Sequence, residues 1–121
     1  MMMTARTLDL RSASRFFKAL GDETRLRIVA LLSHGELCVC HLEEALGIQQ
    51  SNASRQMAVL RAAGIVDHRR EGSWVYYRLA PQTDDLCRRQ LRRLSKDFGK
   101  QDILRLDVER LLRVKGPGSC R

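Results

Sequence analysis

Apolar residues recur every three or four positions over the first third of the chain, which is the spacing of one face of a helix. The first such run extends from Ser12 to Leu20, and Gly21 directly after it is typical of a helix C-terminus. Asp22 belongs to the residue types that cap helix N-termini, and a second apolar run follows it as far as Leu32. The pattern therefore predicts two consecutive helices at the start of the folded region.

A second pair of helices with a tight connection is predicted in the middle of the chain. Residues 41–46 form a short helical pattern that Gly47 closes. Ser51 or Asn52 then caps a longer helix, whose apolar stripe ends just before Gly64. Two helices separated by so short a turn are typical of the helix-turn-helix motif.

A β-hairpin is predicted directly after this motif. Residues 65–68 and 74–79 have the composition of strands, the second being rich in aromatic residues and Val. The polar stretch 69–73 between them contains a glycine and is expected to form the turn. A hairpin that follows a helix-turn-helix is the winged-helix arrangement. The sequence thus predicts a mainly α fold with a small β-hairpin wing.

The last third of the chain is expected to be helical and basic. A long helix is predicted from Pro81, broken or kinked at Gly99, with the apolar pattern continuing to about Val114. The expected organisation has three parts: a flexible N-terminal arm at residues 1–10, one winged-helix domain at residues 11–114, and a flexible C-terminal tail at residues 115–121.

The charge of the chain points to a polyanionic partner. Its 121 residues include 22 Lys and Arg against 14 Asp and Glu, a formal net charge of +8. Such an excess suits nucleic acid or a membrane surface. No stretch approaches the roughly 20 apolar residues that span a bilayer, and the N-terminus has no secretory pattern. We therefore expect a cytoplasmic protein without a membrane partner, whose four cysteines are reduced thiols.

Polar side chains gather at the start of the second helix of the pair, where a helix-turn-helix reads the major groove. Asn and Gln can pair with adenine and Arg with guanine, while arginines of the wing suit phosphate or the minor groove. A solvated polar helix face is the alternative for the helix alone, and the basic wing beside it favours duplex DNA. The predicted DNA contacts are Gln49, Gln50, Ser51, Asn52, Ser54, Arg55, Gln56, Arg69 and Arg70.

Two cysteines, Cys38 and Cys40, lie at the start of the first helix of this pair. A helix N-terminus lowers the pKa of a thiol, and thiolates bind soft ions. Residues two apart do not face each other on a helix, so a shared ion should need a locally unwound or bent backbone. Ligation is then expected to distort the helix that supports the reading helix. The alternatives are two small buried apolar residues or a redox-sensing dithiol.

Three segments carry a resemblance to a known family. They are GDETRLRIVALL at 21–32, ELCVCHL at 36–42, and SNASRQMAVLRAAGIVDHRREGSWVYYRLAP at 51–81. Together they resemble the ArsR/SmtB family of metal-sensing repressors. The resemblance implies a homodimer that releases its operator on binding the inducing ion, with dimer contacts from the first and last helices. In this chain those contacts would be Phe16, Phe17, Leu20, Leu86, Leu91, Leu94 and Phe98, for which packing within one subunit is the alternative.

The chain departs from the family pattern around the cysteines. His41 replaces the usual Asp after the CVC sequence, and Glu43 stands where arsenite sensors often carry a third cysteine. The N-terminus holds no cysteine, unlike that of cadmium and lead sensors of the CVC type. No His occurs after His68, so the ligands that zinc sensors use on the last helix are missing.

The number of thiols available as ligands decides which ion we expect. Cys38 and Cys40 are the predicted ligands, Cys120 is a tentative third, and Cys87 is expected to serve packing. His41 could add a nitrogen ligand, but a lone His near a helix start is more often at the surface, which is where we expect it. Two or three sulfurs suit a trivalent metalloid better than a tetrahedral divalent ion. The predicted inducer is therefore arsenite or antimonite, with no organic cofactor.

These observations predict an arsenite- or antimonite-responsive repressor of transcription, active in arsenical resistance, that binds an inverted-repeat operator as a dimer. A repressor of the same fold that responds to cadmium, lead or zinc, or to thiol oxidation, is the alternative. An enzyme such as a thiol oxidoreductase would need a Cys-x-x-Cys or a nucleophile paired with a base, and neither is evident. The protein is therefore predicted not to be an enzyme.

Overall fold

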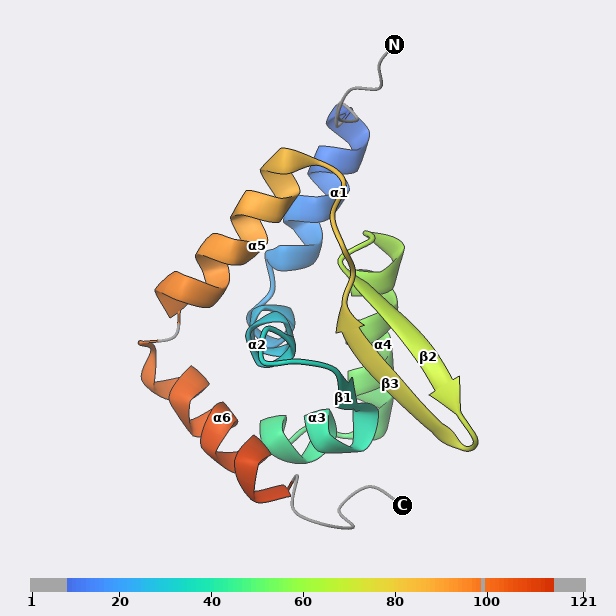
Figure 1. Cartoon of the computed structure of the whole chain (residues 1–121), viewed down its shortest axis with the longest axis vertical. Coiled ribbons are helices and arrows are strands. Elements are labelled where there is room, and N and C mark those ends of the chain that lie inside the picture. The colour runs from blue at the N-terminus through green and yellow to red at the C-terminus, as the bar shows by residue number, and fades with distance from the viewer. Residues whose placement is uncertain (1–8, 99, 115–121) are drawn as a thin grey trace.

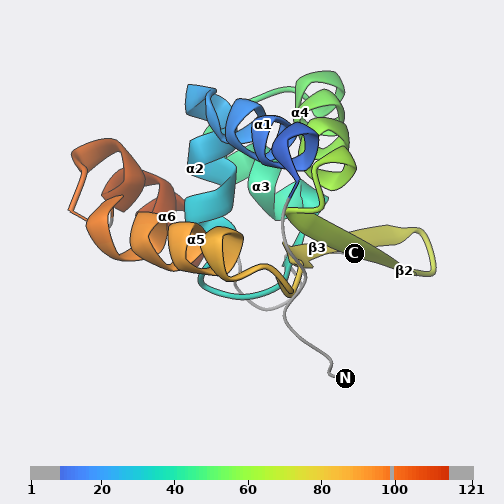
Figure 2. The ribbon, with the colours of Figure 1, turned by 90° about the horizontal axis from the view of Figure 1, so that it is seen from above.

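The computed structural model describes residues 9–98 and 100–114. Helices surround one core, and a β-hairpin extends from them (Figures 1 and 2). The predicted flexible arm at 1–10 is wrong at its end, because Asp9 caps α1 and Leu10 is the first residue of that helix. Residues 1–8 of the arm, the predicted break at Gly99, and the predicted tail at 115–121 with Cys120 lie outside the described residues. The elements in chain order are α1 (Leu10–Leu20), α2 (Glu23–Leu32), β1 (Leu37–Cys38), α3 (Val39–Leu46), α4 (Gln50–Ala62), β2 (Val66–Glu71), β3 (Trp74–Leu79), α5 (Asp85–Phe98) and α6 (Asp102–Val114).

The first two helices begin at aspartate caps. Asp22 accepts a hydrogen bond from the backbone N–H of Arg25 at 3.0 Å, which confirms the predicted cap of α2. Asp9 accepts one from the N–H of Ser12 at 2.7 Å. Because Asp9 is the cap, α1 begins at Leu10 and not at Ser12.

The helix-turn-helix is formed by α3 and α4. Gly47 ends α3 with a φ of 68°, a left-handed conformation that suits glycine. The expected cap at Ser51 or Asn52 is wrong, because Gln49 holds the N-cap position and α4 begins at Gln50. Gln49 makes no side-chain capping bond, so the residue type at this position did not signal the start of the helix.

The wing is longer than the sequence pattern indicated. β2 extends to Glu71, and its pairing with β3 runs from Val66 with Leu79 to Glu71 with Trp74. The predicted turn at 69–73 is wrong, since the turn consists only of Gly72 and Ser73. Gly72 has a φ of 62°, as a two-residue hairpin turn that begins with glycine requires. The strand β1, which the sequence did not predict, adds to the free side of β3 and gives the sheet order β1-β3-β2.

The C-terminal helices fold back over the first part of the chain. α5 begins at Asp85 and not at Pro81, because the carboxylate of Asp84 accepts a hydrogen bond from the N–H of Cys87 at 3.2 Å. α6 then lies beside α3 and also contacts α2 (Figure 1). In the described part of the chain, no helix is both long and apolar enough to cross a membrane.

An ion pair between α2 and α6 lies inside this packing. The guanidinium of Arg27 donates to both carboxylate oxygens of Asp107, at 2.9 and 2.7 Å, and the carboxylate is fully buried. The same guanidinium approaches the carbonyl oxygen of Leu46 at the end of α3 at 3.5 Å. This pair raises the pKa of Arg27, chiefly through the hydrogen bonds to Asp107. The three helices α2, α3 and α6 are thus joined at one polar point within an apolar core.

Candidate functional site

The outer face of α4 presents polar side chains to solvent. Among the predicted DNA contacts, the exposed ones are Gln49, Gln50, Ser51, Ser54 and Arg55. The opposite face of the helix is buried, with Ala53, Met57 and Leu60 in the core. Because these apolar positions recur at helical spacing, they hold α4 with its polar face outward.

Two of the predicted DNA contacts are turned toward the protein itself. The carbonyl oxygen of the Asn52 amide accepts a hydrogen bond from the Gln56 amide at 2.9 Å. The Gln56 oxygen in turn accepts one from the guanidinium of Arg25 on α2 at 2.8 Å. Arg25 also donates to the carbonyl oxygen of Ala19 at 2.6 Å, so it joins α1, α2 and α4. Gln56 therefore helps to fix α4 against α2, and Asn52, which accepts hydrogen bonds from Gln56 and Arg55 of the same helix, orients Gln56.

The two predicted wing arginines differ in their surroundings. Arg69 donates to both carboxylate oxygens of Glu36, at 2.9 and 2.8 Å, and to Glu71 at 3.0 Å. Its guanidinium also lies 4.6 Å from the centre of the Tyr76 ring. Arg70 is exposed and makes no ion pair or hydrogen bond to the described residues. Of the two, Arg70 is therefore the one with a side chain available for phosphate.

The contact between Arg69 and Glu36 shifts the pKa of both side chains. The hydrogen bonds from Arg69 lower the pKa of Glu36, and those to Glu36 and Glu71 raise the pKa of Arg69. Both side chains therefore stay charged at neutral pH. Glu36 directly precedes β1, so this ion pair connects the wing to the segment that carries the cysteines.

The sulfur atoms of Cys38 and Cys40 are 3.0 Å apart, and the Cys40 thiol is the donor of the contact. Cys38 is fully buried and precedes α3 as its N-cap, with the extended angles φ −68° and ψ 145°, while Cys40 is half-buried in the first turn. The expected non-helical backbone is thus a property of the fold. The sulfurs meet without unwinding of α3, because Cys38 stands just before the helix, and the distortion expected on ligation stays a prediction.

The dithiol lies where the sheet meets the helix-turn-helix. Cys38 pairs with Tyr76 of β3, and Leu37 pairs with Tyr77. Cys40 belongs to α3, which contacts β1, β3 and α4. The two sulfurs therefore lie on a strand bonded to the wing and on the helix beside α4. The sequence could not reveal Glu36 and Tyr76 as neighbours of this site, because a two-residue strand leaves no periodic signal.

Other side chains near the sequence motif do not complete a larger ligand cluster. Within residues 9–98 and 100–114, no three His, Cys, Asp or Glu side chains are grouped so that they could hold a metal ion. His41, expected at the surface, is buried on α3. Burial, followed by the charge of Glu44, raises the pKa of Glu43. The described donors at this site are therefore the two sulfurs.

Cys87 is buried on α5 and belongs to the apolar core, as the packing role predicted for it requires. Burial raises the pKa of its thiol, and the nearby Asp84 adds to the effect. A raised pKa leaves less thiolate at neutral pH, and the thiolate is the form that reacts and binds soft ions.

Cys87 should therefore react with iodoacetamide at pH 7.5 more slowly than Cys40 by roughly an order of magnitude, since burial and protonation act in the same direction. Peptide mapping by mass spectrometry after timed alkylation measures each thiol separately. Faster labelling of Cys87 than of the half-buried Cys40 would show that Cys87 is accessible and ionised, against the packing described here.

The residues predicted for a dimer interface fall into two groups. Phe16, Leu20 and Leu91 are buried in the core of the single chain, so packing within the subunit accounts for them. Phe17 is 46% exposed and Leu86 37% exposed. The half-buried residues of this set are Leu94 and Phe98. The apolar surface that a second subunit could cover is therefore narrower than the sequence stripes indicated.

Comparison with known proteins gives a consistent assignment. The family described as "Bacterial regulatory protein, arsR family" matches residues 22–68. The chain is 42% identical over 108 residues to the arsenic resistance transcriptional regulator ArsR1 of Pseudomonas putida, covering 86% of this chain and 84% of that protein. It is 54% identical over 68 residues to the arsenical resistance operon repressor of Escherichia coli, covering 55% of this chain and 58% of that protein.

A solved structure supports the fold. The solution structure of the homodimeric winged helix-turn-helix DNA-binding domain Mb0332 from Mycobacterium bovis has a TM-score of 0.63 and 35% identity to this chain. The match covers 74% of this chain and 82% of that one. The arrangement of α3, α4 and the β2–β3 wing therefore defines a winged helix-turn-helix protein, as predicted. More particularly, this chain belongs to the arsR family of bacterial regulatory proteins, which are DNA-binding transcriptional regulators.

Proposed function

We propose that this protein is a transcriptional repressor that binds an inverted-repeat operator as a homodimer and leaves it when Cys38 and Cys40 bind arsenite or antimonite. The observation that carries the proposal is the 3.0 Å contact between the two sulfurs, at the junction of the wing and the helix-turn-helix. The names of the relatives from P. putida and E. coli, which refer to arsenic and arsenical resistance, support the same function.

The donor set suits a trivalent metalloid. As(III) and Sb(III) supply a soft, thiol-seeking centre, and a close pair of sulfurs at a helix N-terminus is a suitable donor set. A divalent ion such as zinc or cadmium usually takes four ligands. Two of those would have to come from beyond the described residues or from another molecule. Cys120 is the proposed third thiol, from the tail of the same subunit or of its partner.

The DNA contacts are proposed on α4 and the wing. Exposed amide, hydroxyl and guanidinium groups at the start of α4 would read base edges, as their hydrogen-bonding patterns allow. Arg70 would contact phosphate or the minor groove. The residues proposed for base reading are Gln49, Gln50, Ser51, Ser54 and Arg55, while Asn52 and Gln56 are proposed to position them.

The proposed route from the thiols to DNA runs through this chain's own contacts. Cys38 of β1 pairs with Tyr76 of β3 in the sheet. Glu36, two residues before Cys38, accepts two hydrogen bonds from Arg69 of β2. Condensation of the two thiols with arsenite would replace the Cys40 S–H···S contact by a bond from each sulfur to arsenic, with two water molecules leaving, and would act on β1 and on the first turn of α3 together. The wing and α4 would then change position relative to each other. Because both are proposed to contact the same duplex, DNA binding depends on that relative position.

Phe17 and Leu86 are proposed to meet the second subunit, together with the partly exposed Leu94 and Phe98. A dimer would hold two α4 helices about one DNA turn apart, roughly 34 Å, which matches an inverted repeat. Homodimeric assembly of the similar domain Mb0332 supports this arrangement.

An operator-release titration tests the proposal. A duplex enriched from a random-sequence library by binding to the reduced protein serves as the operator, and fluorescence anisotropy follows its release. Arsenite and antimonite should weaken binding by roughly 5- to 150-fold, the range of a coupling of about 1–3 kcal/mol. Release by cadmium, lead or zinc but not by arsenite would overturn the choice of ion. Release by peroxide that a reductant reverses would show that the protein senses oxidation of its thiols and not a metalloid.

A further inference from the structure

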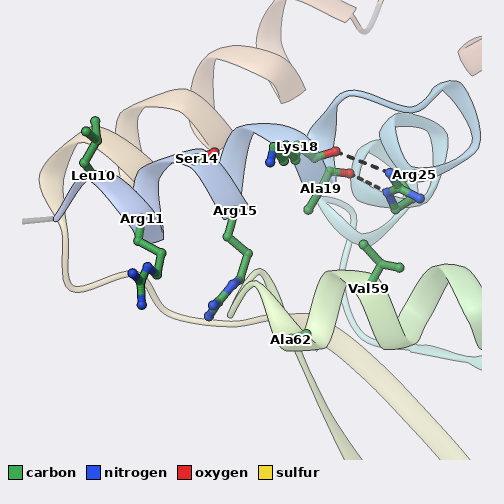
Figure 3. A pocket seen from close by; sticks show the side chains of 9 residues that line it. All are labelled: Leu10, Arg11, Ser14, Arg15, Lys18, Ala19, Arg25, Val59 and Ala62. Carbon is green, nitrogen blue, oxygen red and sulfur yellow. Dashed lines mark hydrogen bonds between the residues drawn. The ribbon is translucent and has the colours of Figure 1, made fainter.

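A basic cleft of about 820 Å³ lies between α1 and the C-terminal half of α4. Figure 3 shows Arg11 and Arg15 extending from α1 toward the end of α4 at Ala62, with Lys18 further along the same helix. No acidic residue is among those that line the cleft. Its lining residues are Leu10, Arg11, Ser14, Arg15, Lys18, Ala19, Arg25, Val59 and Ala62.

The cations form a stripe of their own on α1. Arg11, Arg15 and Lys18 follow the i, i+4, i+7 spacing of one helix face. The core side of α1 consists of Phe16, Ala19 and Leu20, and the exposed Phe17 lies on a further face. The basic stripe is therefore used neither by the core nor by the apolar surface proposed for the second subunit.

The cations of this stripe are available for a partner. In the described part of the chain, no salt bridge or side-chain hydrogen bond holds Arg11, Arg15 or Lys18, although Arg15 lies near the carboxylate of Asp9. Asp9 already caps α1 through the N–H of Ser12. Arg25 differs, because three hydrogen bonds to Ala19, Lys18 and Gln56 fix its guanidinium.

The cleft adjoins the exposed face of α4. Val59 and Ala62, which form its wall, lie one to two turns beyond Ser54 and Arg55 on the same helix. α4 contacts α1 on this side and β2 of the wing on another. A molecule lying along the outer face of α4 would therefore pass the basic stripe of α1 as well as the wing.

We propose that the cleft between α1 and α4 binds the phosphate backbone of duplex DNA, through Arg11, Arg15 and Lys18. The inference rests on the proposed DNA-binding function and adds a third contact region to α4 and the wing. Charge complementarity selects the occupant, since exposed cations without acidic neighbours in the lining suit an evenly charged polyanion. Phosphate contacts of this kind carry no sequence information and instead set affinity and register.

The test compares two variants that each lose two positive charges. One is Arg11→Gln/Arg15→Gln. The matched control is Lys100→Gln/Arg113→Gln, where Lys100 precedes α6, Arg113 lies in the last turn of α6, and both residues are exposed. The probe is a mixed-sequence duplex of about 30 base pairs, roughly three helical turns. Because phosphate contacts are independent of sequence, this probe needs no knowledge of the operator.

The measurement is the slope of log affinity against log salt concentration. Each lost phosphate contact should reduce the magnitude of the slope by about 0.9, hence by about 1.8 per protomer in the cleft variant. The control should keep the native slope. A cleft variant with the slope of the control overturns the proposal. Such a result would leave the proposed repressor function intact, provided that the native protein binds its selected operator and releases it on adding arsenite. A native protein that binds no duplex would contradict both the cleft proposal and the proposed repressor function.

Discussion

Replacing Cys38 and Cys40 together by alanine is expected to leave DNA affinity unchanged and to abolish release by arsenite. The sulfurs lie 3.0 Å apart at the start of α3, away from the exposed face of α4 that is proposed to read DNA. The native protein should lose roughly 5- to 150-fold in operator affinity on adding arsenite, and the variant should lose none. Fluorescence anisotropy with the selected operator, with and without arsenite, measures both quantities.

Two comparisons keep this result interpretable. Cys87→Ala removes a buried thiol on α5 and should retain full release, since that thiol belongs to the core and its pKa is raised by burial. A parallel Cys38→Ser/Cys40→Ser variant preserves a polar atom at each position. Persistent release by arsenite from both dithiol variants would exclude these residues as the inducer site. Loss of DNA binding in both, with the fold intact by circular dichroism, would show that they are part of the DNA-binding structure itself.

Asp107→Ala is expected to lower the free energy of unfolding by about 3 kcal/mol, because it leaves the Arg27 guanidinium without its buried partner. The carboxylate is fully buried and accepts two hydrogen bonds, at 2.9 and 2.7 Å, from a guanidinium that is itself only 15% exposed. Urea denaturation followed by circular dichroism measures the change. The loss should be concentrated where α6 covers α2 and α3, so hydrogen exchange of α6 should rise first.

A matched aspartate on the same helix provides the control. Asp102 is 86% exposed and pairs with Arg105 at the surface, so Asp102→Ala should leave the urea midpoint nearly unchanged. Replacing the whole buried pair, as Arg27→Met/Asp107→Leu, should recover most of the lost stability, because no unpaired charge remains in the core. Equal effects of Asp107→Ala and Asp102→Ala would show that the buried pair contributes nothing particular to α6.

The helices and the wing were largely predictable because their signals are local. Asp22 caps α2 through its side chain, and Gly47 ends α3 in a left-handed conformation, so both act within one turn of the chain. Gly21 marks the end of α1, although its φ of −82° is open to any residue. Strand β3 was predicted at its observed bounds of Trp74–Leu79. The error in the length of β2 arose because the structure of that segment is not decided locally. Polar residues such as those of 69–71 lack a hydrophobic alternation, and pairing with β3 decides their conformation.

The sequence predicted which residues have the chemistry of site residues, but not which partners their side chains contact. Gln56 and Arg69 have the chemistry of DNA-binding residues, yet one is held by Arg25 across 31 positions of sequence and the other by Glu36 across 33. Arg27 and Asp107 gave no sign of their pairing, since 80 positions separate them. Hydrogen bonds over such distances depend on how the helices assemble, which no local pattern encodes.

By itself, the sequence determined the succession of helices, the wing, the positive charge and the presence of two thiols at the start of a helix. These follow from residue type and spacing, which act over a few neighbouring positions. Only the tertiary structure decided that Cys38 lies just outside the helix, paired with β3. It also decided which polar side chains of α4 bond within the protein, and that the basic residues of α1 lie beside the exposed face of α4. The physical reason is that burial and pairing depend on contacts between segments that are distant along the chain.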